Sequence, residues 1–319
     1  MTSFLKSLRL PQKSTKKKIL IASTWRSGST FLGDFFAHYP STYYVYEPLK
    51  YYKDGEGSIA NISKSLILLR DFYICQFFRS STKEYLHLKF QNIKSEKRKF
   101  KANPYDQWTK CSNSPNIVIK TVRLRLQHIE EFLKQWHDNF YLIFLVRDPR
   151  AVINSRLKKD WCRVQSKCID TFDICQDLSA DTDTIFRYKS QYPQNVWLVR
   201  YEDLTLKPYQ TVYKIVNFLQ LPTDYERVNN YLALHTGKTA NGLDVTKTEL
   251  VRRYKNVFGY TMRQNALKQV FKWTDQLNAE NISEIEEFCA KPMKYLGYYN
   301  LSITNQTESL IKPINKVWF

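Results

Sequence analysis

The sequence lacks several features that would assign it to a common class of protein. Its six cysteines include no C-x-x-C pair, so the usual ligand spacing of a structural zinc site is absent, and disulfides or buried thiols remain. No apolar run approaches the ~20 residues of a membrane-spanning helix. Residues 1–18 lack the apolar segment of a signal peptide. Acidic residues are few, because 30 Asp and Glu stand against 49 Lys and Arg, which gives a formal net charge of +19.

This charge predicts an anionic partner, and nucleic acid, a nucleotide, an acidic polysaccharide and an anionic membrane all have the required charge. Charge alone does not choose among them, and a basic surface also serves solubility. The sequence contains no recognisable nucleic-acid-binding module, so nucleic acid is not the expected partner. The 319 residues, 43% of them hydrophobic and 15% aromatic, are enough for one large domain with a full core.

Four N-x-S/T sequons begin at Asn61, Asn281, Asn300 and Asn305. Together with the cysteines they favour an oxidising secretory compartment. A protein of that compartment needs an entry signal, so we expect contact with the membrane only through an anchor that this chain does not contain.

Short apolar segments alternate with segments of helical period. The predicted buried strands are Ile19–Ser23, Tyr43–Tyr46, Asn116–Val122, Phe140–Val146 and Val196–Tyr201. The predicted helices are Thr30–His38, Ile62–Arg79, Leu124–Trp136, Pro149–Lys158, Pro208–Leu219 and Asn281–Tyr295. This alternation predicts an α/β fold with a central parallel sheet flanked by helices.

The alternation also divides the chain. Residues 1–17 are predicted to be a disordered basic segment, residues 18–299 a single domain, and residues 300–319 a C-terminal tail. Residues 53–110 break the alternation and are predicted to be helical at first and then basic and mixed, and residues 159–190 are predicted to be a second, irregular insertion. Insertions above a rigid sheet are where an acceptor site would be built.

The loop Thr24–Thr30 lies between the first predicted strand and its helix. The first backbone N–H groups of that helix point into the loop and carry partial positive charge, which favours a bound phosphate. Gly28 permits close approach of the backbone to a ligand. Further donors come from three hydroxyl groups and one guanidinium, those of Ser27, Ser29, Thr30 and Arg26. The first glycine and the lysine of G-x-x-x-x-G-K-S/T are missing, and S-G-S-T alone is also common in ordinary turns.

A second motif follows the strand Phe140–Val146. Asp148 is suited to cap the next helix and Pro149 to begin it. Arg147 therefore lies at the carboxyl end of a sheet strand, where open α/β sheets bind ligands. Ser155 lies about two turns into the helix, so an anion between the two would meet a guanidinium and a hydroxyl. The two motifs together predict two phosphate sites at one edge of the sheet.

These motifs resemble those of a known family. T-W-R-S-G-S-T-F at residues 24–31 resembles the 5′-phosphosulfate loop of the carbohydrate sulfotransferases, and L-V-R-D-P-R-A-V-I-N-S-R at 145–156 resembles their 3′-phosphate motif. The resemblance spans most of residues 18–299 and includes Y-V-Y-E-P-L at 44–49, V-I-K-T-V-R at 118–123, V-R-Y-E-D-L at 199–204 and C-A-K-P-M-K-Y-L-G-Y at 289–298. It is closest to the Golgi group that sulfates the 6-hydroxyl of galactose, N-acetylgalactosamine or N-acetylglucosamine.

The resemblance implies a P-loop-like fold, a Golgi or secretory location, a glycan acceptor, for which a polyanionic chain is one alternative, and 3′-phosphoadenosine 5′-phosphosulfate (PAPS) as the sulfuryl donor. The implied binders of the 5′-phosphosulfate are Arg26, Ser27, Gly28, Ser29 and Thr30, and those of the 3′-phosphate are Arg147 and Ser155. Tyr201 is implied near the adenine, and Arg263 in a loop that closes over the nucleotide. Gln264 and Asn265 depart from the family pattern in that loop.

Sulfuryl transfer resembles phosphoryl transfer in needing in-line attack, with charge developing on the leaving phosphate oxygen. Arg26 is the candidate to stabilise that charge. The loop Thr24–Thr30, where the resemblance puts the phosphosulfate, is the donor loop. Glu47, at the end of a strand beside this loop, is the candidate base for the acceptor hydroxyl. The alternative for Glu47 is an acidic residue that pairs with a nearby Arg or Lys. Three basic residues at the end of another strand, Lys120, Arg123 and Arg125, are predicted to face an acidic acceptor or the donor, and solvated surface charges are an equally open alternative. No metal is expected, because arginines fill the cation roles.

Weaker candidates for the base are Asp34, which complements the dipole of the donor helix, and the histidines, for which surface roles are expected. Two other functions stay open. A nucleotide kinase or ATPase is disfavoured by the missing glycine and lysine. A non-catalytic binder of heparin or nucleic acid would depend on the +19 charge alone, and its binding would survive loss of the donor motifs.

Overall fold

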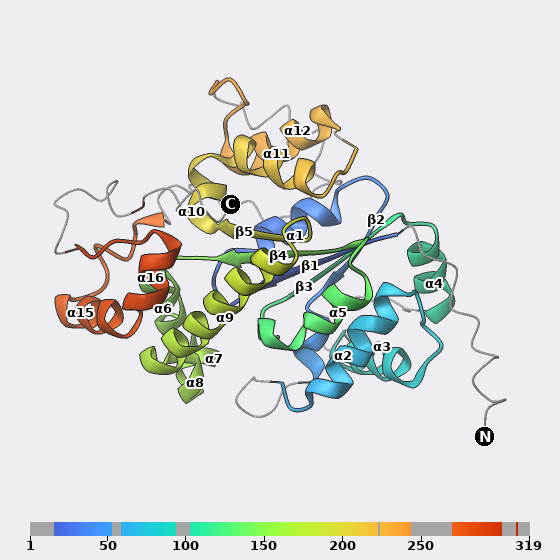
Figure 1. Cartoon of the computed structure of the whole chain (residues 1–319), viewed down its shortest axis with the longest axis horizontal. Helices are drawn as coiled ribbons and strands as arrows, with labels where there is room; N and C mark the ends of the chain where they lie inside the picture. Colours follow the sequence, from blue (N-terminus) through green and yellow to red (C-terminus); the bar gives the residue numbers. More distant parts are fainter. Residues whose placement is uncertain are drawn as a thin grey trace.

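The computed structural model describes residues 16–52, 59–93, 103–222, 224–243, 270–301 and 311. Its centre is a five-stranded sheet with the strand order β2-β3-β1-β4-β5 (Figure 1). The strands are β1 (Lys17–Ser23), β2 (Thr42–Tyr46), β3 (Asn116–Thr121), β4 (Phe140–Val146) and β5 (Val196–Arg200). Every pairing is parallel, so all five carboxyl ends meet at one edge. The order reverses around β1, and such a switch point is where α/β sheets bind ligands.

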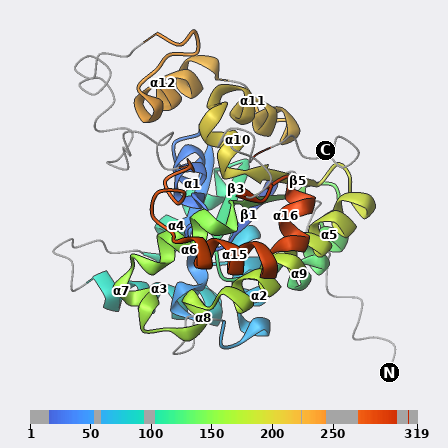
Figure 2. The ribbon, with the colours of Figure 1, turned by 90° about the vertical axis from the view of Figure 1, so that its left-hand side faces the viewer.

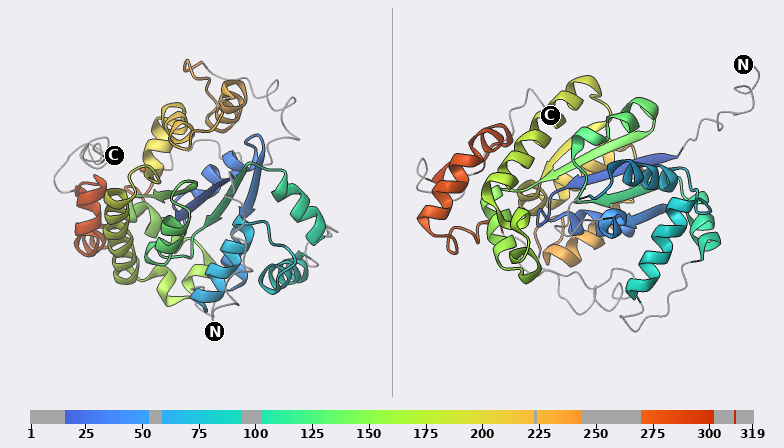
Figure 3. Two further views of the ribbon diagram at one scale, coloured as in Figure 1. Left: turned by 45° about the vertical axis from the view of Figure 1, so that its right-hand side comes forward. Right: turned by 90° about the horizontal axis from the view of Figure 1, so that it is seen from below.

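Helices cover both faces of the sheet (Figures 1 and 3). One face carries α1 (Ser29–Ala37), α10 (Tyr201–Leu206), α11 (Pro208–Phe218) and α12 (Tyr225–Thr236). The other carries α2 (Ile62–Tyr73), α3 (Ser80–Ile93), α5 (Glu130–Gln135) and α9 (Thr171–Gln191). The remaining elements are η1 (Pro48–Tyr51), α4 (Pro104–Ser112), η2 (Leu126–His128), α6 (Pro149–Leu157), α7 (Asp160–Arg163), α8 (Ser166–Ile169), α15 (Ala279–Phe288) and α16 (Ala290–Leu296).

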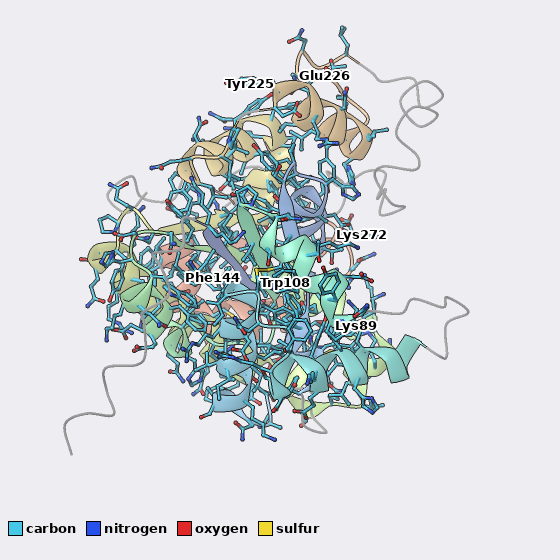
Figure 4. The ribbon with its side chains drawn as sticks, turned by 90° about the vertical axis from the view of Figure 1, so that its right-hand side faces the viewer. Lys89, Trp108, Phe144, Tyr225, Glu226 and Lys272 are labelled. Atoms are coloured by element: carbon cyan, nitrogen blue, oxygen red, sulfur yellow. A yellow bond between two sulfur atoms is a disulfide. The ribbon has the colours of Figure 1, made fainter. Side chains whose placement is uncertain are left out.

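The alternation of side chains along β1 accounts for the two helical layers. Ile19 and Ile21 belong to the apolar cluster under α1 and α11, whereas Leu20 and Ala22 belong to the cluster under α2 and α9. A strand that is buried on both faces is expected to be apolar along its centre, and residues 19–22 of β1 show this pattern. Figure 4 shows the contrast between Phe144 of β4, inside the molecule, and Tyr225 at the start of α12, on its periphery.

The prediction of a P-loop-like α/β fold is confirmed, and the five predicted strands are present with their ends within two residues. Several details were wrong. Tyr201 begins α10 and does not end a strand, and Lys17, which was assigned to the disordered segment, begins β1. Residues 159–190 form α7, α8 and most of the long helix α9, and are not irregular. Residues 1–15 lie outside the described part of the chain, as do all residues after 301 except Ile311.

Three predicted helices are interrupted. Ile62–Arg79 ends as α2 at Tyr73, and Cys75 beyond it has a φ of +54°. Leu124–Trp136 is divided into η2 and α5, and Asn281–Tyr295 into α15 and α16. In each case the apolar period continues across the break, which is why the period alone did not predict the break.

All six cysteines are paired, and the sequence separation within a pair ranges from 6 to 114 residues. The disulfides are Cys75–Cys111, Cys162–Cys168 and Cys175–Cys289. The last spans a sequence separation of 114 residues and joins α9 to the junction of α15 and α16. Closing such a long loop restricts the unfolded chain most, so this bond is expected to contribute most to stability. In the described residues, no helix has the length and apolar character that crossing a membrane requires.

Candidate active site

A cavity of about 510 Å³ lies at the carboxyl edge of the sheet, and residues that follow all five strands line it. Nine of the predicted site residues are in its wall: Arg26, Gly28, Ser29, Thr30, Glu47, Lys120, Arg123, Arg147 and Tyr201. Ser27 and Ser155 are not in its wall, and Arg263 lies outside the described residues. The sequence thus predicted about half of the wall, because parallel strands bring their carboxyl ends together.

The donor loop is shaped for close approach by a ligand. Gly28 has a φ of +85°, and a Cβ atom at this position would lie 2.2 Å from the ring of Tyr201. The loop backbone therefore passes directly against an aromatic face. Helix α1 begins at the next residue, and no side chain caps its first turn. The N–H groups at this end of the helix carry the partial positive charge that favours an anion.

Ser27 stabilises the loop from inside. Its side chain is fully buried, and its hydroxyl lies 2.8 Å from that of Thr24. Its backbone N–H also donates to the carbonyl oxygen of Thr24. The role implied for Ser27 at the phosphosulfate stays a prediction, and these contacts give it a role in the shape of the loop.

The two phosphate motifs are joined by hydrogen bonds. Arg147 donates from Nη1 to the backbone oxygen of Arg26 at 3.0 Å. Arg26 in turn donates from Nε to the hydroxyl of Ser155 at 2.9 Å. The guanidinium carbon of Arg147 lies 4.5 Å from the centre of the Tyr201 ring, within the range of a cation–π contact. Arg147 therefore touches both the donor loop and the residue implied near the adenine.

The turn after β4 holds Arg147 in this position. Asp148 caps α6 by accepting from the N–H of Arg150, and Pro149 is the first helical residue, as the sequence predicted. The N–H of Asp148 donates to Oε1 of Glu202, whose Oε2 accepts from the hydroxyl of Tyr298. Burial raises the pKa of the Glu202 carboxyl, and the nearby Asp148 charge raises it further. This buried network fixes where β4 ends and the helix begins.

Glu47 is held by two cations. Its carboxylate accepts from Lys120 Nζ at 2.6 Å and from Arg123 Nη1 at 2.8 Å, and only 3% of the residue is exposed. The backbone of Glu47 has a φ of +44°, an uncommon conformation for a residue with a side chain, which turns the chain into η1. Burial lowers the pKa of Lys120, and the Glu47 charge opposes that shift. The pairing that the sequence left open is present, and the role of Glu47 as a base stays a prediction.

Some wall residues had no signal in the sequence. They are Trp25, Phe31, Tyr46, Lys50, Val122, Trp161, Leu204, Thr205, His235 and Thr236. The expectation of a surface role was wrong for His235, which is 7% exposed. Its Nδ1 lies 2.8 Å from the carbonyl oxygen of Tyr231, which can only accept, so Nδ1 carries the proton and a neutral ring leaves Nε2 as an acceptor. Burial lowers the pKa of His235, which favours that neutral ring.

The described part of the cavity wall is strongly positive. It contains the basic residues Arg26, Lys50, Lys120, Arg123 and Arg147, and Glu47 as the acidic one. Two of the basic residues are paired with Glu47, so the positive character is strongest on the side of the cavity near Arg147. Within the described ranges, no group of three His, Cys, Asp or Glu side chains has an arrangement that could hold a metal ion. The chemistry of the site is therefore that of an anion-binding cavity with one carboxylate at its side.

Replacing Gly28 by alanine tests the close approach to Tyr201. Gly237 has a similar φ of +72°, but a Cβ atom added there would meet no atom within 4 Å, so Gly237→Ala is a matched control for backbone strain alone. We expect Gly28→Ala to lower the free energy of unfolding by about 1 to 3 kcal/mol more than Gly237→Ala does, because the ring must move. Urea denaturation of the two variants measures this, and equal losses would show that Tyr201 does not confine the loop.

Comparison with known proteins agrees with this geometry. The sulfotransferase domain family matches residues 16–297. Carbohydrate sulfotransferase 3 of Mus musculus is 22% identical over 362 aligned positions, which cover 95% of this chain and 73% of the relative. Carbohydrate sulfotransferase 4 of Mus musculus is 25% identical over 349 positions, which cover 91% of this chain and 83% of the relative.

Among solved structures, the sulfotransferase domain from the Synechococcus PCC 7002 olefin synthase is similar at a TM-score of 0.47 and 19% identity, and the alignment covers 87% of this chain and 97% of that one. The family match rests on the sequence, and it includes both phosphate motifs and the residues that follow every strand of the sheet. Because it extends over most of the chain, this protein belongs to the sulfotransferase domain family.

Proposed function

We propose that this protein transfers the sulfuryl group of PAPS to a hydroxyl of a sugar, and specifically to the 6-hydroxyl of a hexose or N-acetylhexosamine in a glycan. The observation that carries the proposal is the hydrogen-bonded link between the two phosphate motifs, in which Arg147 donates to the backbone of Arg26 and Arg26 donates to Ser155. This link brings two cations to one cavity, and the donor has an anionic group at each end of its ribose. The names of the relatives support a sugar as the acceptor.

The cavity fits such a donor on several counts. Its volume of about 510 Å³ is typical of a site for a small molecule. The uncapped first turn of α1 and the Gly28 backbone suit the 5′-phosphosulfate, and Arg147 suits the 3′-phosphate. The rings of Phe31 and Tyr201 in the same wall offer apolar faces for a base.

PAPS, when bound, supplies the activated sulfuryl group. The chain supplies the positive charges that bind PAPS and the positive charge that stabilises the leaving phosphate. Arg26 lies in the donor loop, so its guanidinium and the N–H groups of α1 are the groups that would stabilise negative charge on a phosphate oxygen. Since these donors are fixed by the fold before any ligand binds, they need little rearrangement during the reaction.

Glu47 is the proposed base. It lies in the cavity wall at the carboxyl end of β2, and its ion pairs with Lys120 and Arg123 orient the carboxylate. Both carboxylate oxygens are engaged by cations, so an acceptor hydroxyl must replace part of this pairing before its proton can pass to Glu47. The same two cations would then remain beside the acceptor, which is one of the two positions that the sequence left open for them.

The disulfides support a secretory location. Disulfides persist in oxidising compartments and are rare where glutathione keeps thiols reduced. All six cysteines of this chain are paired, and two of the bonds connect separate helices or helix junctions. We therefore place the working protein in the Golgi lumen or the secretory pathway.

Incubation with PAPS that carries a radiolabelled sulfuryl group, together with a panel of desulfated glycans, tests the proposed function. We expect label on at least one glycan, and release of the label after mild acid hydrolysis of the sulfate ester. Protein heated beyond its unfolding transition is the control for non-enzymatic transfer. Absence of label from every glycan would contradict the proposal.

The variant Glu47→Gln tests the base. The amide keeps the size of the side chain and can still accept from Lys120, but it cannot take a proton from a hydroxyl. We expect turnover to fall by about 100-fold or more while retention on immobilised adenosine 3′,5′-bisphosphate is unchanged. Asp34→Asn is the matched control, because Asp34 is the rival carboxylate on α1 and does not line the cavity. Full turnover in Glu47→Gln would remove Glu47 as the base.

A further inference from the structure

A second cavity adjoins the first. It has a volume of about 350 Å³ and is lined by residues of the donor loop, the segment after β3, α6, α8, the first turns of α9 and the start of α2. Trp25, Val122 and Arg123 line both cavities and so form their common wall. Helices α2 and α8 lie toward the same lower end of the molecule in Figures 1 and 2. Among the described residues, only these three side chains therefore need to be crossed between the two cavities.

Arg156 is the unusual residue of this second cavity. It is 5% exposed, and its side chain donates from Nε to the Trp25 carbonyl at 3.3 Å and from Nη1 to the Cys168 carbonyl at 3.1 Å. No carboxylate of the described residues lies within 4.0 Å of its guanidinium. A buried charge without an opposite charge is unfavourable, and such charges concentrate where ligands bind.

Arg150, earlier on the same helix, is a buried arginine whose charge the fold neutralises, so it is a useful comparison. It is also fully buried, but it pairs with Asp148 at 2.7 Å and with Glu286 at 2.6 Å. The fold therefore supplies two carboxylates to one buried arginine of α6 and none to the other. Burial, and to a smaller extent the Arg125 charge, lower the pKa of Arg156 to about 9, and this value still leaves the guanidinium protonated at neutral pH.

The neighbours of Arg156 compensate its charge only from a distance. Arg125 is paired with Asp177 and Asp181, and Arg123 is paired with Glu47. Asp177 influences Arg156 only as a more distant charge, and Lys167 adds a further basic residue to the lining. In the described lining, four basic residues face two acidic ones, Asp173 and Asp177. An incoming anion would provide the opposite charge that Arg156 lacks.

The position of the shared wall indicates which molecule brings that anion. The anionic groups of the donor are assigned to the first cavity, near Arg26 and Arg147, and neither of these residues lines the second. Arg123 contacts the proposed base Glu47 and also lines the second cavity. A sugar chain with its reacting hydroxyl at Glu47 would thus reach the second cavity across Arg123. Trp25, with Trp161 edge-on to it at 5.6 Å, offers an aromatic surface for a sugar ring on that path.

We propose that the second cavity is a specificity site for an anionic group of the acceptor, a carboxylate or a sulfate ester on a sugar near the one that is sulfated, and that Arg156 binds it. The proposal rests on the proposed function, because it assigns the acceptor to the side of Glu47. The proposal predicts that the enzyme is selective for acidic glycans. It also identifies where the anionic partner that the net charge predicts would bind.

The test compares three forms of one desulfated oligosaccharide: the form that contains uronic acids, its carboxyl-reduced neutral form, and the neutral form with one sulfate ester added. We expect kcat/KM of the unaltered protein to be about 10-fold to 100-fold higher for the acidic forms than for the neutral one. The sulfated and uronic forms separate the two sources of negative charge. Equal kcat/KM for all three forms would overturn the proposal.

Arg156→Gln tests the residue. The glutamine amide can still donate to a backbone carbonyl, but it carries no charge. We expect it to raise KM for the acidic acceptor to the neutral value and to leave kcat/KM for the neutral acceptor unchanged, while Arg156→Lys restores part of the preference. A proportional loss on both acceptors would indicate a merely structural role and would overturn the proposal.

Two further variants complete the test. Lys167→Gln removes an exposed charge of the same lining and should reduce the preference for the acidic form even if the Arg156 variants do not fold. Arg163→Gln is the matched control, because Arg163 is an exposed arginine of the same insertion that lines neither cavity, and it should keep the full preference. An unchanged preference in Lys167→Gln together with a lost preference in Arg163→Gln would overturn the assignment to this cavity.

Calorimetric binding of the uronic oligosaccharide, with adenosine 3′,5′-bisphosphate present, separates this proposal from the proposed function. If no acceptor receives label but binding is lost in Arg156→Gln, the proposed transfer fails and the anion site stands. If label is transferred but Arg156→Gln binds the uronic and neutral forms as the unaltered protein does, the transfer stands and the anion site fails.

Discussion

The hydrogen bond from Arg147 to the backbone oxygen of Arg26 is the contact on which the site depends. It ties the end of β4 to the loop after β1, although the two residues are 121 positions apart in the chain. Gly28 and Tyr201 pack beside it, and the Arg147 guanidinium lies over the Tyr201 ring. Three neighbouring strand ends are thus joined around one cation. The buried network of Asp148, Glu202 and Tyr298 keeps that cation in place.

The distribution of charge explains how one basic surface can serve two substrates. Near Glu47 the cations Lys120 and Arg123 are neutralised by a carboxylate, whereas Arg147 brings its positive charge to the side of the cavity that suits a nucleotide. Beyond the shared wall, Arg156 is buried without a carboxylate partner in the described residues. The proposed roles therefore divide one edge of the sheet into a donor region, a carboxylate that acts as the base, and a further anion-binding region.

Much of this could be predicted from the sequence, because the strands are continuous apolar runs and because a parallel sheet gathers their ends. The donor loop, Arg147 and Glu47 follow directly from those two facts. The family match favours a sulfotransferase over the two alternatives that the sequence left open, a nucleotide kinase and a non-catalytic polyanion binder. What the sequence could not predict depends on tertiary contacts. His235 reaches the cavity from α12, which is remote in sequence from the donor loop. Arg156 is buried, and no carboxylate of the described residues forms an ion pair with it, which depends on how distant segments pack.

The most direct measurement compares the binding of adenosine 3′,5′-bisphosphate and adenosine 5′-monophosphate by calorimetry, since the two differ only in the 3′-phosphate assigned to Arg147. A charge-assisted contact to that phosphate predicts that the bisphosphate binds about 10-fold to 100-fold more tightly, and that Arg147→Ala removes the difference. Equal affinities in the unaltered protein, or a difference that persists in Arg147→Ala, would contradict a donor site built on the link between the two motifs.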